Sequence, residues 1–276
     1  MNIGFIQKRK YANGKKEDGL SKLCSTALAL ALNSTLLTPK IKPKKDKYPI
    51  LINWGVSDIP WLLNRAPLAA VLNHPNFIRV AINKISAFHI FEANEVSVPK
   101  FTTSKAKAAS WFDVNEKAMV FCRTLPSSFQ GKGIVIAKSK EELVDAPLYT
   151  LRFPKKWEYR IHVVNSQPIF VQQKKKLSKE KLKERGIEDN DGLIRSYNNG
   201  YTYSSNINLS QSNPIFIEMC NQAVKAVDSL RLFFGAVDVI VSKSGKIAVL
   251  EVNTAPGIEG KTIETYVEAF NKYINS

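Results

Sequence analysis

The chain has 276 residues, 44% of them hydrophobic, and this length allows two modest domains or one large one. No apolar run reaches the ~20 residues that span a bilayer, and the start of the chain lacks the basic region and apolar core of a signal peptide. We therefore expect no membrane partner. Three widely separated cysteines with no metal or disulfide pattern favour a reducing, cytoplasmic setting.

The charge balance is strongly basic. There are 40 Lys and Arg residues against 24 acids, a net charge of +16, and residues 1–50 alone carry eleven basic residues and three acids. Such a field attracts polyanions or acidic substrates. A nucleic-acid partner is therefore possible, but no basic motif interleaved with aromatic residues accompanies the charge. Solubility combined with a phosphate-rich ligand site explains the excess equally well.

The first part of the chain alternates strands and a helix. Strands are expected at 2–7, 35–38 and 50–55, a helix at 20–32, and an exposed Lys- and Pro-rich loop at 39–48. This alternation predicts a small α/β lobe. The turn sequence Asn73-His-Pro-Asn ends it, and we place the domain boundary after residue 75.

The next segment predicts a helix at 77–93, then a hairpin whose loop suits an anion. Strands at 117–124 and 134–137 flank a Ser/Gly loop, and Arg123 ends the first strand. Gly131 and Gly133 let backbone N–H groups face a phosphate, and Lys132 adds a positive charge. Ser139, with Glu142 three residues later, predicts the cap of a short helix.

Several strands and helices are expected in the second half. The expected strands lie at 148–155, 158–164 and 169–176, and the expected helices at 179–185, 215–232 and 261–274. In the strand at 158–164, alternation places Glu158 and Arg160 on one face and Tyr159 and Ile161 on the other. His162 shares the face of Arg160; a structural histidine is the more common outcome at such a position.

A β-hairpin near the C-terminus carries the strongest chemical signal. Two β-branched runs, 236–241 and 247–252, flank a Ser-Lys-Ser-Gly turn. Asp238 lies in the first strand, and Glu251 and Asn253, two residues apart, point to one face of the second. Three oxygen donors without His or Cys suit Mg²⁺, which shares its coordination with water and phosphate oxygens. The alternative is that these acids are solvated or paired with lysines.

These motifs resemble a known superfamily. Gly235-Ala-Val-Asp, followed by Leu250-Glu-Val-Asn-Thr-Ala-Pro-Gly-Ile-Glu-Gly260, is similar to the metal-binding end of ATP-grasp ligases, with RimK-like carboxylate–amine ligases the nearest match. The resemblance covers about residues 77–260, with several motifs in order. It implies an α/β (α+β) fold in which two subdomains, 76–150 with the lid and 151–276 with the metal, clasp ATP behind a small α/β lobe at 1–75.

The resemblance also implies roles for individual residues. Asp238, Glu251 and Asn253 would hold Mg²⁺ or Mn²⁺; Arg160, Arg195 and Asn198 would act in catalysis. The nucleotide would contact Lys84, Arg123, Gly131, Lys132, Gly133, Tyr149, Leu151, Glu158 and Lys174, with backbone groups of the strand at 148–155 reading adenine. The chain departs from the family in two places: Arg123 replaces the usual lysine, and Gly200 is followed by Tyr-Thr-Tyr where the family has a second glycine.

The resemblance implies an ATP-dependent ligase. ATP would phosphorylate a substrate carboxylate, and an amine would attack the acyl phosphate to give an amide, ADP and phosphate. The substrates could be an amino acid and a peptide or protein. The alternative function is a basic, nucleic-acid-associated protein that keeps the fold without ligase activity.

Overall fold

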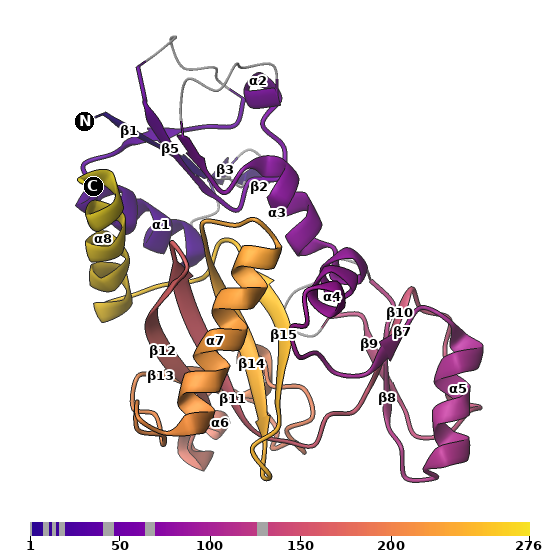
Figure 1. Cartoon of the computed structure of the whole chain (residues 1–276). Coiled ribbons are helices and arrows are strands. Elements are labelled where there is room, and N and C mark those ends of the chain that lie inside the picture. The colour runs from indigo at the N-terminus through magenta and orange to yellow at the C-terminus, as the bar shows by residue number, and fades with distance from the viewer. Residues whose placement is uncertain are drawn as a thin grey trace.

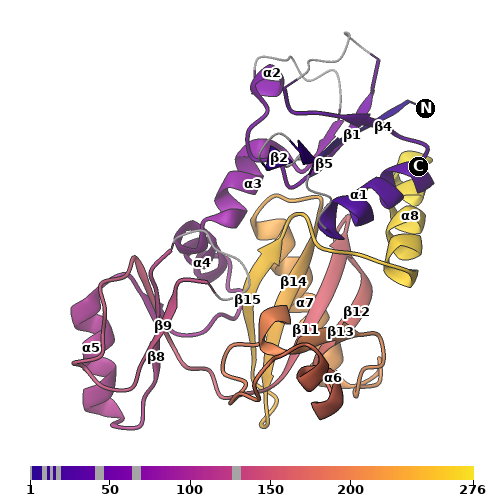
Figure 2. The same cartoon turned by 180° about the vertical axis from the view of Figure 1, so that it is seen from behind.

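The structure is a computed structural model that describes residues 2–7, 11–12, 15–16, 20–40, 47–63, 70–125 and 132–276. The chain forms three units, each built on its own main sheet (Figure 1). An N-terminal lobe lies at the top of the view, a small antiparallel unit at the lower right, and a larger five-stranded unit below the lobe. Figure 2 shows the same arrangement from behind.

The N-terminal lobe contains a parallel sheet with the strand order β4-β1-β5-β6. Its elements are β1 (Ile3–Gln7), the short pair β2 (Tyr11–Ala12) and β3 (Lys15–Lys16), α1 (Leu20–Ala31), β4 (Thr35–Leu37), β5 (Ile50–Trp54), α2 (Pro60–Leu63) and β6 (Ala70–Leu72). All five residues of both β1 and β5 are buried, as is typical of parallel strands covered on two faces. The expected α/β lobe is therefore present. Of the expected loop at 39–48, residues 41–46 lie outside the described residues.

The second unit is an antiparallel sheet with the order β7-β10-β8-β9. It consists of β7 (Phe101–Thr102), α5 (Lys105–Val114), β8 (Val120–Arg123), β9 (Ile134–Ala137) and β10 (Leu148–Leu151). Trp111 and Phe112 of α5 pack against Cys122 and Tyr149 of the sheet.

The prediction of a helix beginning at Ser139 is wrong. The chain forms turns between β9 and β10, where the Glu142 carboxylate accepts the Lys138 N–H at 2.7 Å. The acid therefore closes a turn over residues 138–142 and does not complete a helix cap.

The third unit is an antiparallel sheet with the order β13-β12-β11-β14-β15. Its elements are β11 (Lys155–Val164), β12 (Gln167–Lys176), α6 (Lys179–Glu184), the 3-10 turn η1 (Tyr197–Asn199), β13 (Tyr201–Ser204), α7 (Pro214–Ser229), β14 (Phe234–Ser242) and β15 (Ile247–Asn253). Helix α7 covers one face (Figure 1), and Tyr159 and Ile161 point into the core beneath it. The apolar residue Ile217 of α7 is 49% exposed.

The helix expected at 77–93 is two helices, α3 (Pro75–Ile82) and α4 (Lys84–Ala93). Asn83 separates them because its extended backbone ends α3 while its side chain accepts the N–H groups of Ile85 and Ser86. Both helices pack into the core of the third sheet, through Ile78 and Phe91 among others. The start of the predicted lid-bearing subdomain thus shares a core with the predicted metal-binding one.

Helix α8 (Lys261–Ile274) returns to the N-terminal lobe and lies beside α1 (Figures 1 and 2). Tyr266 and Phe270 join a core that also contains Phe5, Trp54 and Phe234. Of the helices in the described part of the chain, none combines the length and apolar character that a bilayer crossing requires.

Candidate active site

A cavity of about 1030 Å³ opens on the face of the third sheet that α7 leaves uncovered. Its walls come from β11 to β15 on one side and from β8, β9 and β10 on the other, and Lys84 of α4 and Cys24 of α1 also reach it. All three units therefore contribute to one site.

A row of four polar side chains crosses the cavity face of the sheet. Gln172 pairs with Arg160, Arg160 with Asp238, and Asp238 with Glu251 along the registers of β12, β11, β14 and β15. Side chains at directly paired positions lie on the same face and in contact range. The acids predicted to converge on the hairpin are thus directly opposite each other, and an arginine lies next to them in the same row.

Arg160 binds both oxygens of Asp238. Its Nε lies 2.7 Å from Oδ1 and its Nη2 3.0 Å from Oδ2, while Lys174 Nζ is 3.7 Å from Oδ2. Burial alone raises the pKa of the Asp238 carboxyl, but Arg160 and then Lys174 outweigh this and hold that pKa below its ordinary value. Asp238 is therefore ionised although it is buried.

Two further acids of the cavity, Glu158 and Glu251, are also paired with lysines. Glu158, 2% exposed, accepts from Lys155 at 2.9 Å and from Lys174. Glu251 Oε2 lies 3.3 Å from Lys84 Nζ, and its Oε1 accepts a 3.4 Å hydrogen bond from the amide of Asn253. Each buried negative charge thus has a positive partner within the protein, as burial requires.

Further positive charge remains for a ligand. Arg123 and Arg195 both line the cavity, and the Nε atom of each is buried with no hydrogen-bond partner among the described residues. Burial lowers the pKa of the Arg123 guanidinium, with Glu251 opposing that effect. Buried donors without partners are rare and call for an explanation. An anionic ligand in this cavity would supply the missing acceptors.

Ten of the predicted site residues line this cavity. They are Lys84, Arg123, Leu151, Glu158, Arg160, Lys174, Arg195, Asp238, Glu251 and Asn253. The predicted alternation of Glu158 and Arg160 against Tyr159 and Ile161 is confirmed, because the first pair faces the cavity and the second the core. On β12, Lys174 reaches the cavity, whereas Lys176 pairs with Asp189 on the surface.

The remaining predicted site residues that the structure describes do not line the cavity. Gly131 lies outside the described residues, and Lys132 and Gly133 lie at the end of the β8–β9 loop, outside the cavity wall. Asn198 is exposed on η1. The Tyr149 side chain is turned into the core of the second unit, where its hydroxyl donates to Val144 O and accepts from Ala146 N.

The sequence did not single out several residues of the cavity. Strict alternation from Glu158 and Arg160 would place Lys155 on the face away from the cavity. A register shift between Lys155 and Trp157 brings it to the cavity face instead. Tyr201 and Tyr203 also line the wall, and the Arg160 guanidinium lies 4.2 Å from the ring centroid of Tyr203. The two tyrosines are two residues apart on one strand, and this spacing could have indicated that they share a face.

The donor set suits a hard divalent cation. In the described part of the chain, no group of three His, Cys, Asp or Glu side chains has metal-site geometry. Two opposed carboxylates and the side-chain amide of Asn253 nevertheless share the cavity face, and such a set leaves room for water and phosphate oxygens. In type and placement the residues fit Mg²⁺, although Arg160 and Lys84 now hold the two carboxylates.

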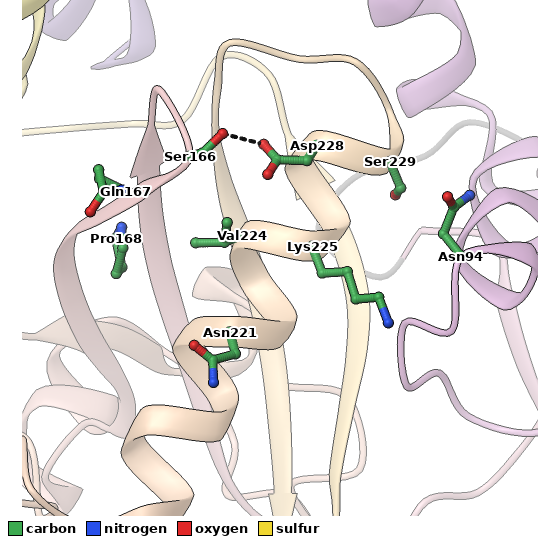
Figure 3. A pocket seen from close by; sticks show the side chains of 9 residues that line it. All are labelled: Asn94, Ser166, Gln167, Pro168, Asn221, Val224, Lys225, Asp228 and Ser229. Atoms are coloured by element: carbon green, nitrogen blue, oxygen red, sulfur yellow. Dashed lines mark hydrogen bonds between the residues drawn. The ribbon is translucent and has the colours of Figure 1, made fainter.

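A second depression, of about 620 Å³, lies between α7 and the β11–β12 turn (Figure 3). Its charged groups are already paired: Ser166 donates to Asp228 at 2.8 Å, and Lys225 lies 3.2 Å from Glu95. It gathers no converging charges, so the larger cavity is the candidate active site.

Several solved structures have a fold similar to that of this chain. D-alanine–D-alanine ligase from Bacillus anthracis is similar with a TM-score of 0.66 and 13% identity, covering 100% of this chain and 95% of that one. The ATP-grasp ligase PsnB in complex with a minimal precursor has a TM-score of 0.64 and 13% identity, covering 98% of each chain. N5-carboxyaminoimidazole synthetase from Staphylococcus aureus with ADP has a TM-score of 0.62 and 12% identity, covering 92% of this chain and 70% of that one.

The chain therefore has the ATP-grasp fold, and the predicted fold class is confirmed. No protein-family model matches the sequence, and no curated protein sequence is significantly similar to it. The RimK-like subtype and the division at residue 75 stay predictions.

Proposed function

We propose that this protein is an ATP-dependent, ADP-forming carboxylate–amine ligase that works in the cytoplasm. The observation that carries the proposal is the large cavity, whose lining combines two opposed carboxylates with two arginines, Arg123 and Arg195, that have unsatisfied buried donors. Phosphoryl transfer needs this combination of charge neutralisation and alignment more than covalent help from the protein. Similar structures include ligases, one of them an ATP-grasp enzyme by name and another solved with ADP.

ATP would bind with its phosphates among the cationic side chains. Lys84 and Arg123 come from the side of α4 and the second unit, and Arg160, Lys174 and Arg195 from the third. Leu151, at the end of β10, lies where the two sheets meet the cavity and suits the base. Glu158 holds Lys155 and Lys174 in place, so we assign it a positioning role within the nucleotide site.

Asp238, Glu251 and Asn253 would hold Mg²⁺ or Mn²⁺. When bound, the ion neutralises phosphate charge and fixes the orientation of the triphosphate. Arg123 and Arg195 would add hydrogen bonds to phosphate oxygens through their planar guanidinium groups.

The proposed reaction has two steps. A substrate carboxylate oxygen attacks the γ-phosphorus of ATP, and ADP leaves with the electrons of the broken P–O bond. An amine nitrogen then attacks the acyl carbon, phosphate leaves, and the nitrogen loses a proton to give the amide. Arg160 and Arg195 would stabilise the negative charge that develops on the transferring group.

The carboxylate and the amine would meet at the β13 end of the cavity. Tyr201, Tyr203 and the exposed ring of Tyr197 form its wall, and Arg195 lies 5.7 Å from the Tyr201 ring centroid. An amino acid as one substrate and a peptide or protein as the other would suit this open, aromatic and cationic wall. PsnB, which has the same fold, was solved with a precursor bound.

Release of ADP that requires both an added carboxylate and an added amine is the direct test. Glu251→Ala should abolish turnover without unfolding the protein, because Glu251 lies on the cavity face opposite Asp238. Glu268→Ala, which removes an exposed acid on α8, is the matched control and should keep full activity. Turnover at the normal rate in Glu251→Ala would refute the metal assignment.

A second function is favoured by the net charge of +16. If the protein is a nucleic-acid-associated member of the fold without ligase activity, it should bind DNA or RNA with a steep salt dependence. That binding should survive both Asp238→Ala and Glu251→Ala.

A further inference from the structure

The pairing of Arg160 with Asp238 conflicts with a metal at Asp238. Both carboxylate oxygens accept hydrogen bonds from the same guanidinium, at 2.7 and 3.0 Å, and the two side chains are only 12% and 7% exposed. The ring of Tyr203 lies against the guanidinium plane, with 4.2 Å between Arg160 Cζ and the ring centroid. Asp238 therefore holds the Arg160 guanidinium along one edge, and the Tyr203 ring packs against its face.

A divalent ion cannot share Asp238 with this guanidinium at low cost. Metal and guanidinium would be like charges separated by a single carboxylate, in a buried site where screening is weak. Glu251 presents a milder form of the same conflict, because Lys84 lies 3.3 Å from one oxygen and contributes a single ammonium group. In the arrangement seen, the protein's own cations take the place of the metal.

We propose that Arg160 is an exchangeable clamp on Asp238, so that a divalent ion gains this ligand only when nucleotide phosphate draws Arg160 away. The proposal rests on the proposed function, since it takes Asp238 as a metal ligand and triphosphate as the incoming anion. Phosphate offers guanidinium the same two-oxygen partner that a carboxylate does. The exchange therefore keeps every charge paired: Arg160 passes from carboxylate to phosphate, and the metal replaces it on Asp238.

The clamp makes metal binding depend on nucleotide. Without ATP, free metal must displace a buried, geometrically matched ion pair, so its affinity is low. With ATP present, the phosphates replace Asp238 as the partner of Arg160, and the metal binds together with phosphate oxygens as ligands. In this order of binding, Asp238 stays ionised and paired with Arg160 until ATP, the substrate that needs the metal, is present.

Titration of the nucleotide-free protein with Mn²⁺, followed by electron paramagnetic resonance, tests the clamp. Arg160→Met should bind Mn²⁺ about tenfold or more tightly than wild type, because it frees both oxygens of Asp238 and removes the like charge. Arg123→Met is the matched control, since it removes an equal charge from the same cavity without touching Asp238, and it should gain much less. Adding Asp238→Asn to Arg160→Met should abolish the gain.

Thermal denaturation gives an independent measurement should Arg160→Met fold poorly. The variant leaves a buried carboxylate without its partner, so its melting temperature should be lower than that of wild type. Mn²⁺ alone should raise that melting temperature by more than it raises that of wild type.

Two results would overturn the clamp. One is an Arg160→Met variant that binds Mn²⁺ no better than wild type; the other is an equal gain in Arg123→Met, which would show a general effect of charge. Both leave the proposed function standing, provided that wild type binds Mn²⁺ when an ATP analogue is present. If none of these proteins binds Mn²⁺ even with the analogue, the clamp and the proposed function fail together.

Discussion

His162 lies on the cavity face of β11, two residues beyond Arg160, yet its ring is fully buried. Its Nε2 lies 3.0 Å from the Gln172 side-chain oxygen and its Nδ1 3.1 Å from the Tyr266 hydroxyl. Because the amide oxygen can only accept, Nε2 carries the proton and Nδ1 accepts from Tyr266. Burial lowers the pKa of His162 to about 4. The residue is thus neutral and structural, and it orients Gln172 at the end of the polar row.

This neutral histidine predicts a pH dependence of stability. The folded pKa, about 4, is below the ordinary value of 6.5, so the unfolded chain binds the proton more readily. The contribution of His162 is complete above pH 6.5 and is lost as the pH falls toward 4, by about 2 kcal/mol at pH 5. Urea denaturation at pH 7 and pH 5 should show this loss in wild type but not in His162→Gln, which has no imidazole to protonate. An equal loss in both proteins would contradict the assignment.

At the scale of single residues, the sequence predicts cavity residues well where they lie on strands. Arg160, Asp238 and Glu251 follow from alternation, because a strand offers a side chain only two faces. Loop residues have no such rule, so Asn198 was assigned to the site although its neighbour Tyr197, and not Asn198 itself, lines the cavity. Pairing of the hairpin acids with lysines was the alternative that the sequence left open, but the pairing of Asp238 with Arg160 was beyond prediction, since it depends on the register between β11 and β14.

Among the elements, the N-terminus of α4 has the most direct bearing on the site. Asn83 caps α4 with two hydrogen bonds of 3.1 Å, and the next residue is Lys84, whose side chain reaches Glu251. The cap therefore decides where the helix begins and, with it, the position of the lysine.

Replacing Asn83 with Ala should weaken both the fold and the site. Loss of the cap should lower the free energy of unfolding by about 1 kcal/mol. Nucleotide affinity should fall as well, since the first turn of α4 positions Lys84. Ser104→Ala removes a cap of the same kind from α5, where the Ser104 side chain accepts from Lys107 N, and neither Ser104 nor α5 is part of the cavity wall. It should cost similar stability and leave ATP affinity unchanged; equal losses of affinity in the two variants would contradict the role of α4.

The break at Asn83 also shows why element boundaries are hard to predict. Apolar residues recur at helical spacing through α3 and α4 because both helices pack on the same core. The periodic pattern therefore continues across a position at which the backbone is extended. The hairpin of β14 and β15 was predictable because its turn and its β-branched strands agree with each other.

For the whole molecule, the decisive contacts join distant parts of the chain. Asn73 accepts the N–H groups of Phe233 and Phe234 and donates to Phe234 O, which ties the end of the N-terminal lobe to the start of β14. A Cβ atom at Gly55 would lie 2.5 Å from Cβ of Ala255, a cavity residue just beyond the hairpin of β14 and β15. The lobe thus braces one wall of the site.

Such long-range contacts explain which part of the fold the sequence could not reveal. The order of most elements, and the presence of a small lobe followed by two subdomains, follow from local patterns and from the family resemblance. That α8 shares a core with Trp54 and Phe5 does not, because no periodicity in α8 identifies the surface that its apolar face will meet.

Nucleotide and a divalent ion are expected to bind together in this cavity at the hairpin acids. Crystals grown with ADP and Mn²⁺, measured at the manganese absorption edge, test this expectation. An anomalous peak should lie beside the side-chain oxygens of Asp238, Glu251 and Asn253, with diphosphate between the peak and Arg123. A nucleotide bound outside the cavity, or a manganese peak remote from these three residues, would contradict it.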